Sequence, residues 1–240
     1  QRARAFIRDW VKATPKETTQ HNDQADVVGC FVRDRATAME GLLSNNHVFA
    51  NVNSALIGDE IRQPGRADTG TTADRMASLQ GFIPIQFGGA SNQVDCAWAT
   101  PDAPMRIENR TDRFDSAENL VGQLGSTAPS TVLPGDFVTK TGRTTGYTSG
   151  EVDLINVNNL NVDMGGGAVA RFDGQIQITS LSKVPFSLGG DSGSLIVNTN
   201  SAPVGLLFAG SGSGGFENTG LTWANPIDVV LNRLNLDIVV

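Results

Sequence analysis

The sequence predicts an all-β fold, either a sandwich or a barrel. Most apolar residues occur in runs of about four to eight residues, and Gly, Asn, Pro or Asp separate these runs. The runs do not alternate with helical patterns, which argues against a parallel α/β sheet. Helical periodicity is confined to the two ends of the chain. The expected strands are Val27–Val32, Gly41–Ser44, Ala55–Ile57, Gly81–Phe87, Val94–Ala99, Asp136–Lys140, Gly150–Val157, Gln175–Ser180, Ser194–Val197, Val204–Phe208 and Leu221–Ala224.

Both ends of the chain carry a helical pattern. A short N-terminal helix is expected over Arg4–Lys12, because its apolar residues share one face. The polar segment Thr14–Asp26 follows as a loop. At the other end Pro226 is expected to start a helix, with Asn225 as its N-cap.

A loop-rich stretch, Thr100–Pro134, divides the chain into two halves. We therefore expect the N-terminal helix and loop at 1–26 and a first β unit at 27–115. A second β unit, which ends in the C-terminal helix, is expected at 116–240.

Composition argues against several classes of function. The net charge of −7 repels phosphate backbones, so nucleic acid is not an expected partner. No window approaches the roughly 18 apolar residues of a membrane span. The chain has two histidines, His21 and His47, and no Cys-x-x-Cys spacing, so neither a metal nor another cofactor is expected. Cys30 and Cys96 would allow one disulfide bridge, but we expect two buried free thiols.

The stretch Leu188–Ser194 places one hydroxyl, that of Ser192, between glycines. Glycines allow a tight turn and a close approach to a ligand. A tight turn can also point successive N–H groups into one concavity that stabilises an oxyanion. The stretch therefore indicates a nucleophile beside an oxyanion hole, and the alternative is an ordinary hairpin turn.

A serine nucleophile needs a base, and the base needs an orienting acid. His21 lies in a polar loop, whereas His47 directly follows an apolar strand, so His47 is the better candidate for the base. Asp95 lies in the apolar segment Val94–Ala99, where an ionised carboxylate without partners would be costly. An imidazole N–H would satisfy it, although a capped turn or a local ion pair is the alternative.

The order His47, Asp95, Ser192 is the order found in the chymotrypsin β-barrels. Around these residues, Ser44–Val48, Val94–Ala97 and Gly190–Ser194 resemble the motifs of chymotrypsin-like serine peptidases, and the resemblance covers roughly residues 27–237. It implies two six-stranded antiparallel β-barrels with the triad between them and a C-terminal helix.

The segment Val138–Gly150 resembles the start of the second barrel in bacterial peptidases of the streptogrisin and α-lytic type. In those secreted enzymes two cysteines bracket the segment, and here Thr139 and Ser149 stand in their places. Other segments resemble bacterial trypsin-like peptidase domains without disulfides, to which the plant Nal1-type peptidases look related. Loss of the bridge suits a reducing compartment, so a cytoplasmic location is expected, with secretion after removal of a signal peptide as the alternative.

The resemblance also implies roles around Ser192. The N–H groups of Gly190 and Ser192 would form the oxyanion hole, and Asp191 would support the turn. No Ile-Val-Gly-Gly sequence follows a cleavage site, so Asp191 is expected to pair with Lys140 or Arg143 without activation by cleavage.

The substrate pocket is the next element that the resemblance implies. Phe186 would lie at its base beside Ser187, and its wall would be Phe208, Ala209 and Gly210. These residues predict a small or apolar P1 residue; the alternative is that Phe186 and Phe208 fill the pocket and the protein is a poor catalyst.

The leading hypothesis is therefore a serine endopeptidase that acts on a peptide or protein substrate through an acyl-enzyme. The alternative is a trypsin-fold pseudoenzyme or a protein-recognition domain of a larger assembly. An unrelated β-rich binding protein would need three coincident motifs in the correct order.

Overall fold

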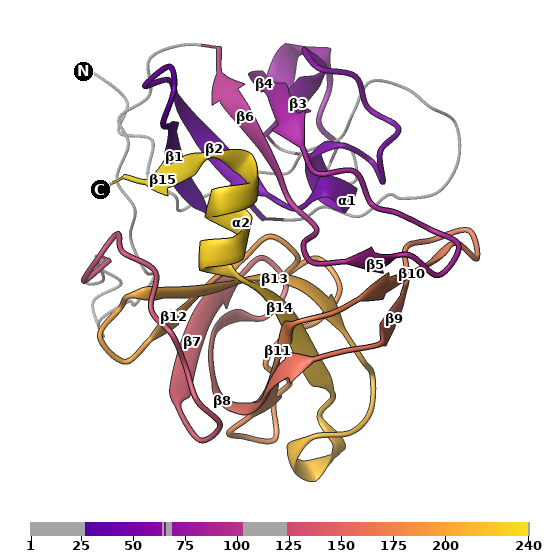
Figure 1. Cartoon of the computed structure of the whole chain (residues 1–240), viewed down its shortest axis with the longest axis vertical. Helices are drawn as coiled ribbons and strands as arrows, with labels where there is room; N and C mark the ends of the chain where they lie inside the picture. Colours follow the sequence, from indigo (N-terminus) through magenta and orange to yellow (C-terminus); the bar gives the residue numbers. More distant parts are fainter. Residues whose placement is uncertain (1–26, 64, 66–68, 103–123, 240) are drawn as a thin grey trace.

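The computed structural model describes residues 27–63, 65, 69–102 and 124–239, and it shows two β-rich halves, one above the other (Figure 1). The first half contains a six-stranded sheet, and the second contains a closed barrel of six strands. The predicted all-β class is confirmed. The helix expected over Arg4–Lys12 lies outside the described residues.

The sheet of the first half is antiparallel throughout, with the strand order β15-β1-β2-β6-β4-β3. Leu42, Leu79 and Ala99 are fully buried in it, and they pack against Phe49 from the short helix that follows β2. Its strands are β1 (Cys30–Asp34), β2 (Glu40–Ser44), β3 (Glu60–Arg62), β4 (Arg75–Phe82), β6 (Ala97–Pro101) and β15 (Leu236–Ile238).

The barrel of the second half closes in the order β11-β14-β13-β12-β7-β8. Alternate residues point inward, as in β7, where Val138, Lys140 and Gly142 are buried. Its strands are β7 (Phe137–Gly142), β8 (Gly146–Val157), β11 (Gln175–Ser180), β12 (Leu195–Asn198), β13 (Pro203–Gly210) and β14 (Leu221–Pro226).

A small third sheet joins the two halves. Its strands are β5 (Ser91–Asn92), β9 (Leu160–Asp163) and β10 (Val169–Phe172), and β5 pairs in parallel with β10 (Figure 1). An apolar cluster fixes it to the barrel, with the Phe172 and Phe208 ring centroids 4.7 Å apart. The β9–β10 hairpin is thereby held beside β13.

The chain returns to the first half at its C-terminus. Helix α2 (Ile227–Leu234) leaves the barrel and ends at Asn235, whose left-handed backbone (φ 58°) turns the chain into β15 (Figure 1). Strand β15 then pairs with β1. The expected helix is confirmed, but the expected cap is wrong. Pro226 occupies the N-cap position, and the Asn225 side chain is buried between the halves.

Some sequence predictions fail where tertiary contacts decide the structure. Strand β11 matches its predicted bounds, and most other strands are shifted by a few residues. The strand expected at Ala55–Ile57 is wrong: Ala55 is buried in the core, Leu56 and Ile57 are exposed, and β3 begins only at Glu60. The first described helix, α1 (Asn46–Phe49), is a single turn, too short for a periodic signal. The other short helical turns among the described residues are η2 (Thr72–Asp74) and η3 (Phe216–Asn218).

The two cysteines are free thiols, as expected, and both are buried. Desolvation raises the pKa of Cys30 to about 12 and also raises the pKa of Cys96. Both thiols are therefore held in the unreactive protonated form.

None of the helices in the described part of the chain is long and apolar enough to cross a membrane.

Strand β15 allows a direct test of how strongly the C-terminus holds the first half. Leu236 is fully buried in the core below β1, so Leu236→Ala should lower the free energy of unfolding by about 2–5 kcal/mol. Urea unfolding followed by tryptophan fluorescence measures the change. The control is Asp237→Ala, which removes an exposed ion pair with Arg35 and should cost no more than about 1 kcal/mol. Equal effects would show that β15 contributes little.

Candidate active site

His47 and Asp95 are in direct contact. The imidazole Nδ1 lies 2.5 Å from Asp95 Oδ2, and the His47 backbone N–H donates to Asp95 Oδ1 at 3.1 Å. The Asp95 side chain is fully buried, and within the described residues both hydrogen bonds to its carboxylate come from His47. A carboxylate only accepts hydrogen bonds, so Nδ1 is the donor in this contact, and the neutral form of the ring would present Nε2 as an acceptor.

The single-turn helix α1 aims the His47 ring. Asn45 is extended (φ −80°, ψ 158°) and lets the chain leave β2 and enter the turn. The Asn46 side chain fixes this turn, since its Nδ2 donates to the carbonyl of Ile83 and to Asn53 Oδ1, both at 2.8 Å. The position of the His47 ring is therefore set by buried polar contacts in the first half.

Ser192 lies just after a tight turn formed by Leu188–Asp191. The Asp191 N–H donates to the Leu188 carbonyl at 3.1 Å, and Gly190, at the third position, has φ +92°. A positive φ at that position is the mark of a type II turn and requires glycine. Ser192 itself is half-buried. The predicted glycine-flanked turn is therefore present, with Ser192 at its exit.

The first half holds the backbone of Ser192. The Val27 N–H donates to the Ser192 carbonyl at 2.9 Å, and Ser44 Oγ donates to the Val27 carbonyl at 2.6 Å. Gly193 has φ +88°, and a Cβ there would overlap Val27 and Ser44. Glycine is required at this position both for its backbone conformation and for this close approach.

Two backbone donors near Ser192 have no acceptor in the part of the chain that the structure describes. Within the described residues, neither the Gly190 N–H nor the Ser192 N–H donates to a protein acceptor. Buried N–H groups nearly always have a partner in folded proteins. These two N–H groups are therefore available to a ligand oxygen.

His47 and Ser192 line one cavity of about 710 Å³. The first half contributes His47, and the second half contributes the rest of the described lining. Of the predicted pocket residues, Ser187, Phe208, Ala209 and Gly210 line this cavity. Phe186 does not line the cavity, because its ring is buried in the barrel core. The prediction that Phe186 lies at the base of the pocket is therefore wrong.

Part of the cavity was missed in the sequence. The β9–β10 hairpin forms one wall through residues 160–165, and Trp223 of β14 adds to it. The hairpin carries no motif, and the glycine run Gly165–Gly167 at its tip is typical of a loop. Asp163 is the one acidic residue among the described lining residues.

Comparisons with known proteins agree with this topology. No family model matches the sequence, and no curated protein matches it. Among solved structures, the Nocardiopsis protease NAPase superposes with a TM-score of 0.62 and 18% identity over 97% of this chain and 100% of that chain. Thermobifida fusca protease A gives a TM-score of 0.60 and Cellulomonas bogoriensis chymotrypsin 0.58, each 18% identical over 96% of this chain and 98% of theirs. The chain has the chymotrypsin-like fold.

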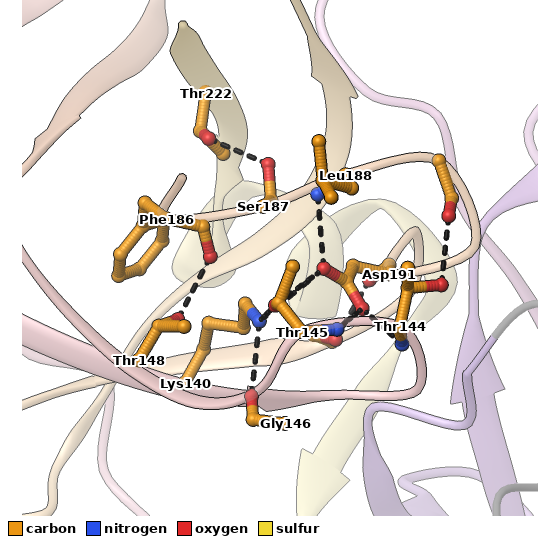
Figure 2. Close-up of polar contacts among 12 residues, drawn as sticks. Lys140, Thr144, Thr145, Gly146, Thr148, Phe186, Ser187, Leu188, Asp191 and Thr222 are labelled. Carbon is orange, nitrogen blue, oxygen red and sulfur yellow. Dashed lines mark hydrogen bonds and ion pairs between the residues drawn. The ribbon is translucent and has the colours of Figure 1, made fainter. Parts of the chain in front are cut away.

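In this chymotrypsin-like fold the Asp191 carboxylate holds the turn before Ser192 (Figure 2). It accepts hydrogen bonds from the N–H groups of Leu188, Thr144 and Thr145 at 3.0, 2.7 and 3.2 Å. Thr145 Oγ1 donates to it at 2.7 Å, and Lys140 Nζ lies 3.4 Å away. Of the expected internal partners of Asp191, Lys140 is the one that contacts it, together with the backbone of the β7–β8 turn.

Lys140 is buried with Asp191. Its Nζ also donates to the Gly146 carbonyl at 3.1 Å and to Thr145 Oγ1. Desolvation lowers the pKa of Lys140 from 10.5 to about 8, and the negative charge of Asp191 opposes that change. The ammonium is therefore still mostly protonated at neutral pH, and the ion pair with Asp191 is retained there.

Replacing Lys140 tests this arrangement. Lys140→Met leaves the Asp191 carboxylate buried without a cation, so the free energy of unfolding at pH 7 should fall by about 3 kcal/mol. Chemical denaturation measures the loss. Lys183→Met, which removes an exposed lysine, should change the free energy of unfolding by no more than about 0.5 kcal/mol. If the two variants unfold alike, the ion pair does not stabilise the turn.

Proposed function

We propose that the chain is a serine endopeptidase that cleaves peptide bonds through an acyl-enzyme. The observation that carries the proposal is the 2.5 Å contact between His47 Nδ1 and the buried Asp95 carboxylate, at a cavity that Ser192 also lines. A carboxylate, an imidazole and a hydroxyl in this order can activate the hydroxyl as a nucleophile. The shared fold with bacterial serine proteases is consistent with the proposal.

The proposed reaction proceeds in two stages, acylation of Ser192 and hydrolysis of the acyl-enzyme. Ser192 Oγ attacks the carbonyl carbon of the substrate while His47 Nε2 takes the hydroxyl proton. His47 then donates this proton to the amine nitrogen as the C–N bond breaks, which leaves an acyl-Ser192 ester. Water hydrolyses the ester by the same proton transfers. Asp95 keeps the imidazole oriented and stabilises its protonated form.

An oxyanion forms on the substrate during both acylation and deacylation, and it needs hydrogen-bond donors. We assign this role to the Gly190 and Ser192 N–H groups, which have no protein acceptor within the described residues. The positive φ of Gly190 supports the assignment, because type II and type I turns differ in the direction of the central peptide. Such donors typically contribute about 3–4 kcal/mol each to the transition state.

An extended substrate can pair with the edge of β13. Ala209 and Gly210 pair with β14 on one side, whereas the strand pairing of β12 with β13 ends at Leu206. Phe208, Ala209 and Gly210 line the cavity, so their second edge faces the place of the substrate. Addition of a peptide strand there would supply backbone hydrogen bonds independent of sequence.

The P1 side chain would enter the cavity beside Ser187 and Gly210, which both line it. Ser187 Oγ forms a hydrogen bond with Thr222 Oγ1 at 2.6 Å (Figure 2). No acidic side chain is among the described residues that line this end of the cavity. A basic P1 residue would lose its hydration without gaining a counter-ion. We therefore propose a small or apolar P1 residue.

Labelling with a fluorophosphonate probe tests the nucleophile. The wild-type protein should be labelled, and Ser192→Ala should abolish labelling because the attacking oxygen is gone. His47→Ala should slow labelling by at least about 10⁴-fold because the base is lost. Gel fluorescence and intact mass measure the adduct, and Ser213→Ala, an exposed serine, is the matched control.

Two results would contradict the proposal. Labelling that persists in Ser192→Ala would remove Ser192 as the nucleophile. A folded wild-type protein that is never labelled would instead favour a recognition domain with this fold.

Substrate selectivity is tested with a peptide library varied at P1. The value of kcat/KM for Ala, Val and Leu at P1 should exceed that for Lys and Arg by at least about tenfold. Liquid chromatography with mass spectrometry locates the cleaved bonds. A preference for basic P1 residues would overturn the pocket assignment and leave the triad assignment intact.

A further inference from the structure

Asp95 receives a contact from the second half that the catalytic roles above do not use. Its backbone N–H donates to Asn225 Oδ1 at 2.9 Å. Asp95 lies just before β6 in the first half, and Asn225 lies on β14 in the second half, 130 residues later. Both residues are fully buried. The segment that carries the acid is therefore bound to the barrel that carries Ser192.

Asn225 is itself oriented by a second buried amide. Its Nδ2 donates to Gln175 Oε1 at 2.7 Å, which directs Oδ1 toward Asp95. Gln175 Nε2 in turn donates to the carbonyl of Gln93 at 2.9 Å and to that of Asp173 at 2.6 Å. The Gln93–Asp95 segment is thus held at two points by side chains of the second half.

The first half adds one contact from the other side. Asn45 Nδ2 donates to the Asp95 carbonyl at 2.8 Å, so both backbone polar groups of Asp95 are bound by buried asparagines. The Asp95 carboxylate, by contrast, is bound within the described residues only by His47. The position of the carboxylate therefore depends on the backbone, and the backbone depends on these amides.

A buried amide pair is costly unless every polar atom is satisfied, and apolar side chains would pack between the halves without that cost. Every side-chain polar atom of the Asn225–Gln175 pair has a hydrogen-bond partner. The free acceptor of this pair, Asn225 Oδ1, binds Asp95, the residue that orients His47. The proposed reaction needs His47 of one half and Ser192 of the other in register, where a misplacement of about 1 Å can cost about 10²-fold in rate.

We propose that Asn225, oriented by Gln175, is a positioning residue for the Asp95–His47 pair. The proposal rests on the proposed peptidase function for its effect on rate, but not for its effect on geometry. Asn225 touches neither the substrate nor the reacting atoms. It acts through the Asp95 N–H and sets where the carboxylate meets His47.

The test compares Asn225→Ala with Asn198→Ala, which removes an asparagine that binds Ser130 and its own turn at the β12–β13 connection. Asn225→Ala should lower kcat by about 10- to 100-fold with KM changed by less than about twofold, because the acid is displaced while the substrate surface is intact. Asn198→Ala should leave both constants within about twofold of wild type.

Proton NMR gives a readout that does not need activity. The hydrogen-bonded His47 Nδ1 proton should give a far-downfield resonance, identified by its absence in His47→Ala. Asn225→Ala should shift or broaden this resonance, and Asn198→Ala should leave it in place. If the wild type cleaves nothing, the peptidase proposal fails, while this resonance still decides the positioning role.

A second variant tests the proposal if Asn225→Ala does not fold. Gln175→Met keeps the Asn225 acceptor and removes the group that orients it, so it should shift the same resonance and lower kcat by a smaller factor. The proposal is overturned if a folded Asn225→Ala or Gln175→Met protein keeps the wild-type resonance and kcat and is merely less stable.

Discussion

A carboxylate buried without access to water must receive hydrogen bonds from its surroundings, and the Asp95 carboxylate receives them from His47. This requirement places α1 against the segment before β6, and it fixes which ring nitrogen of His47 carries the proton. The same segment contacts the second half through Asn225. The contact between the two halves is thus linked to the hydrogen bonding of the buried Asp95 carboxylate.

Asp191 is a second fully buried carboxylate, and the fold satisfies it differently. Its partners are three backbone N–H groups, one threonine hydroxyl and Lys140, none of which exchanges protons with a substrate in the proposed reaction. It therefore determines shape, whereas Asp95 is paired with an imidazole that can accept and release a proton. In the proposed reaction the two buried carboxylates thus support different tasks: Asp191 holds the turn before Ser192, and Asp95 orients the imidazole that transfers protons.

The sequence allowed the fold class and the candidate residues His47, Asp95 and Ser192 to be predicted, because each stands in a distinctive local context. Asp95 lies among apolar residues, and Ser192 lies among glycines. The β9–β10 hairpin, β15 and Phe186 were missed or misplaced because distant packing decides them. Asn225 before Pro226 has the local pattern of a helix cap, but its side chain is bound by Asp95 and Gln175 from other strands. Local propensity could not reveal that competition.

The most direct measurement is a crystal structure of the protein with a peptide boronic acid that carries a small apolar P1 side chain. We expect a covalent bond from Ser192 Oγ to boron and one boronate oxygen about 2.7–3.1 Å from the N–H groups of Gly190 and Ser192. His47 should keep its contact with Asp95 in that complex. A boronate bound elsewhere would rule out Ser192 as the nucleophile, and one bonded to Ser192 with its oxygens turned away from Gly190 would rule out the proposed oxyanion hole.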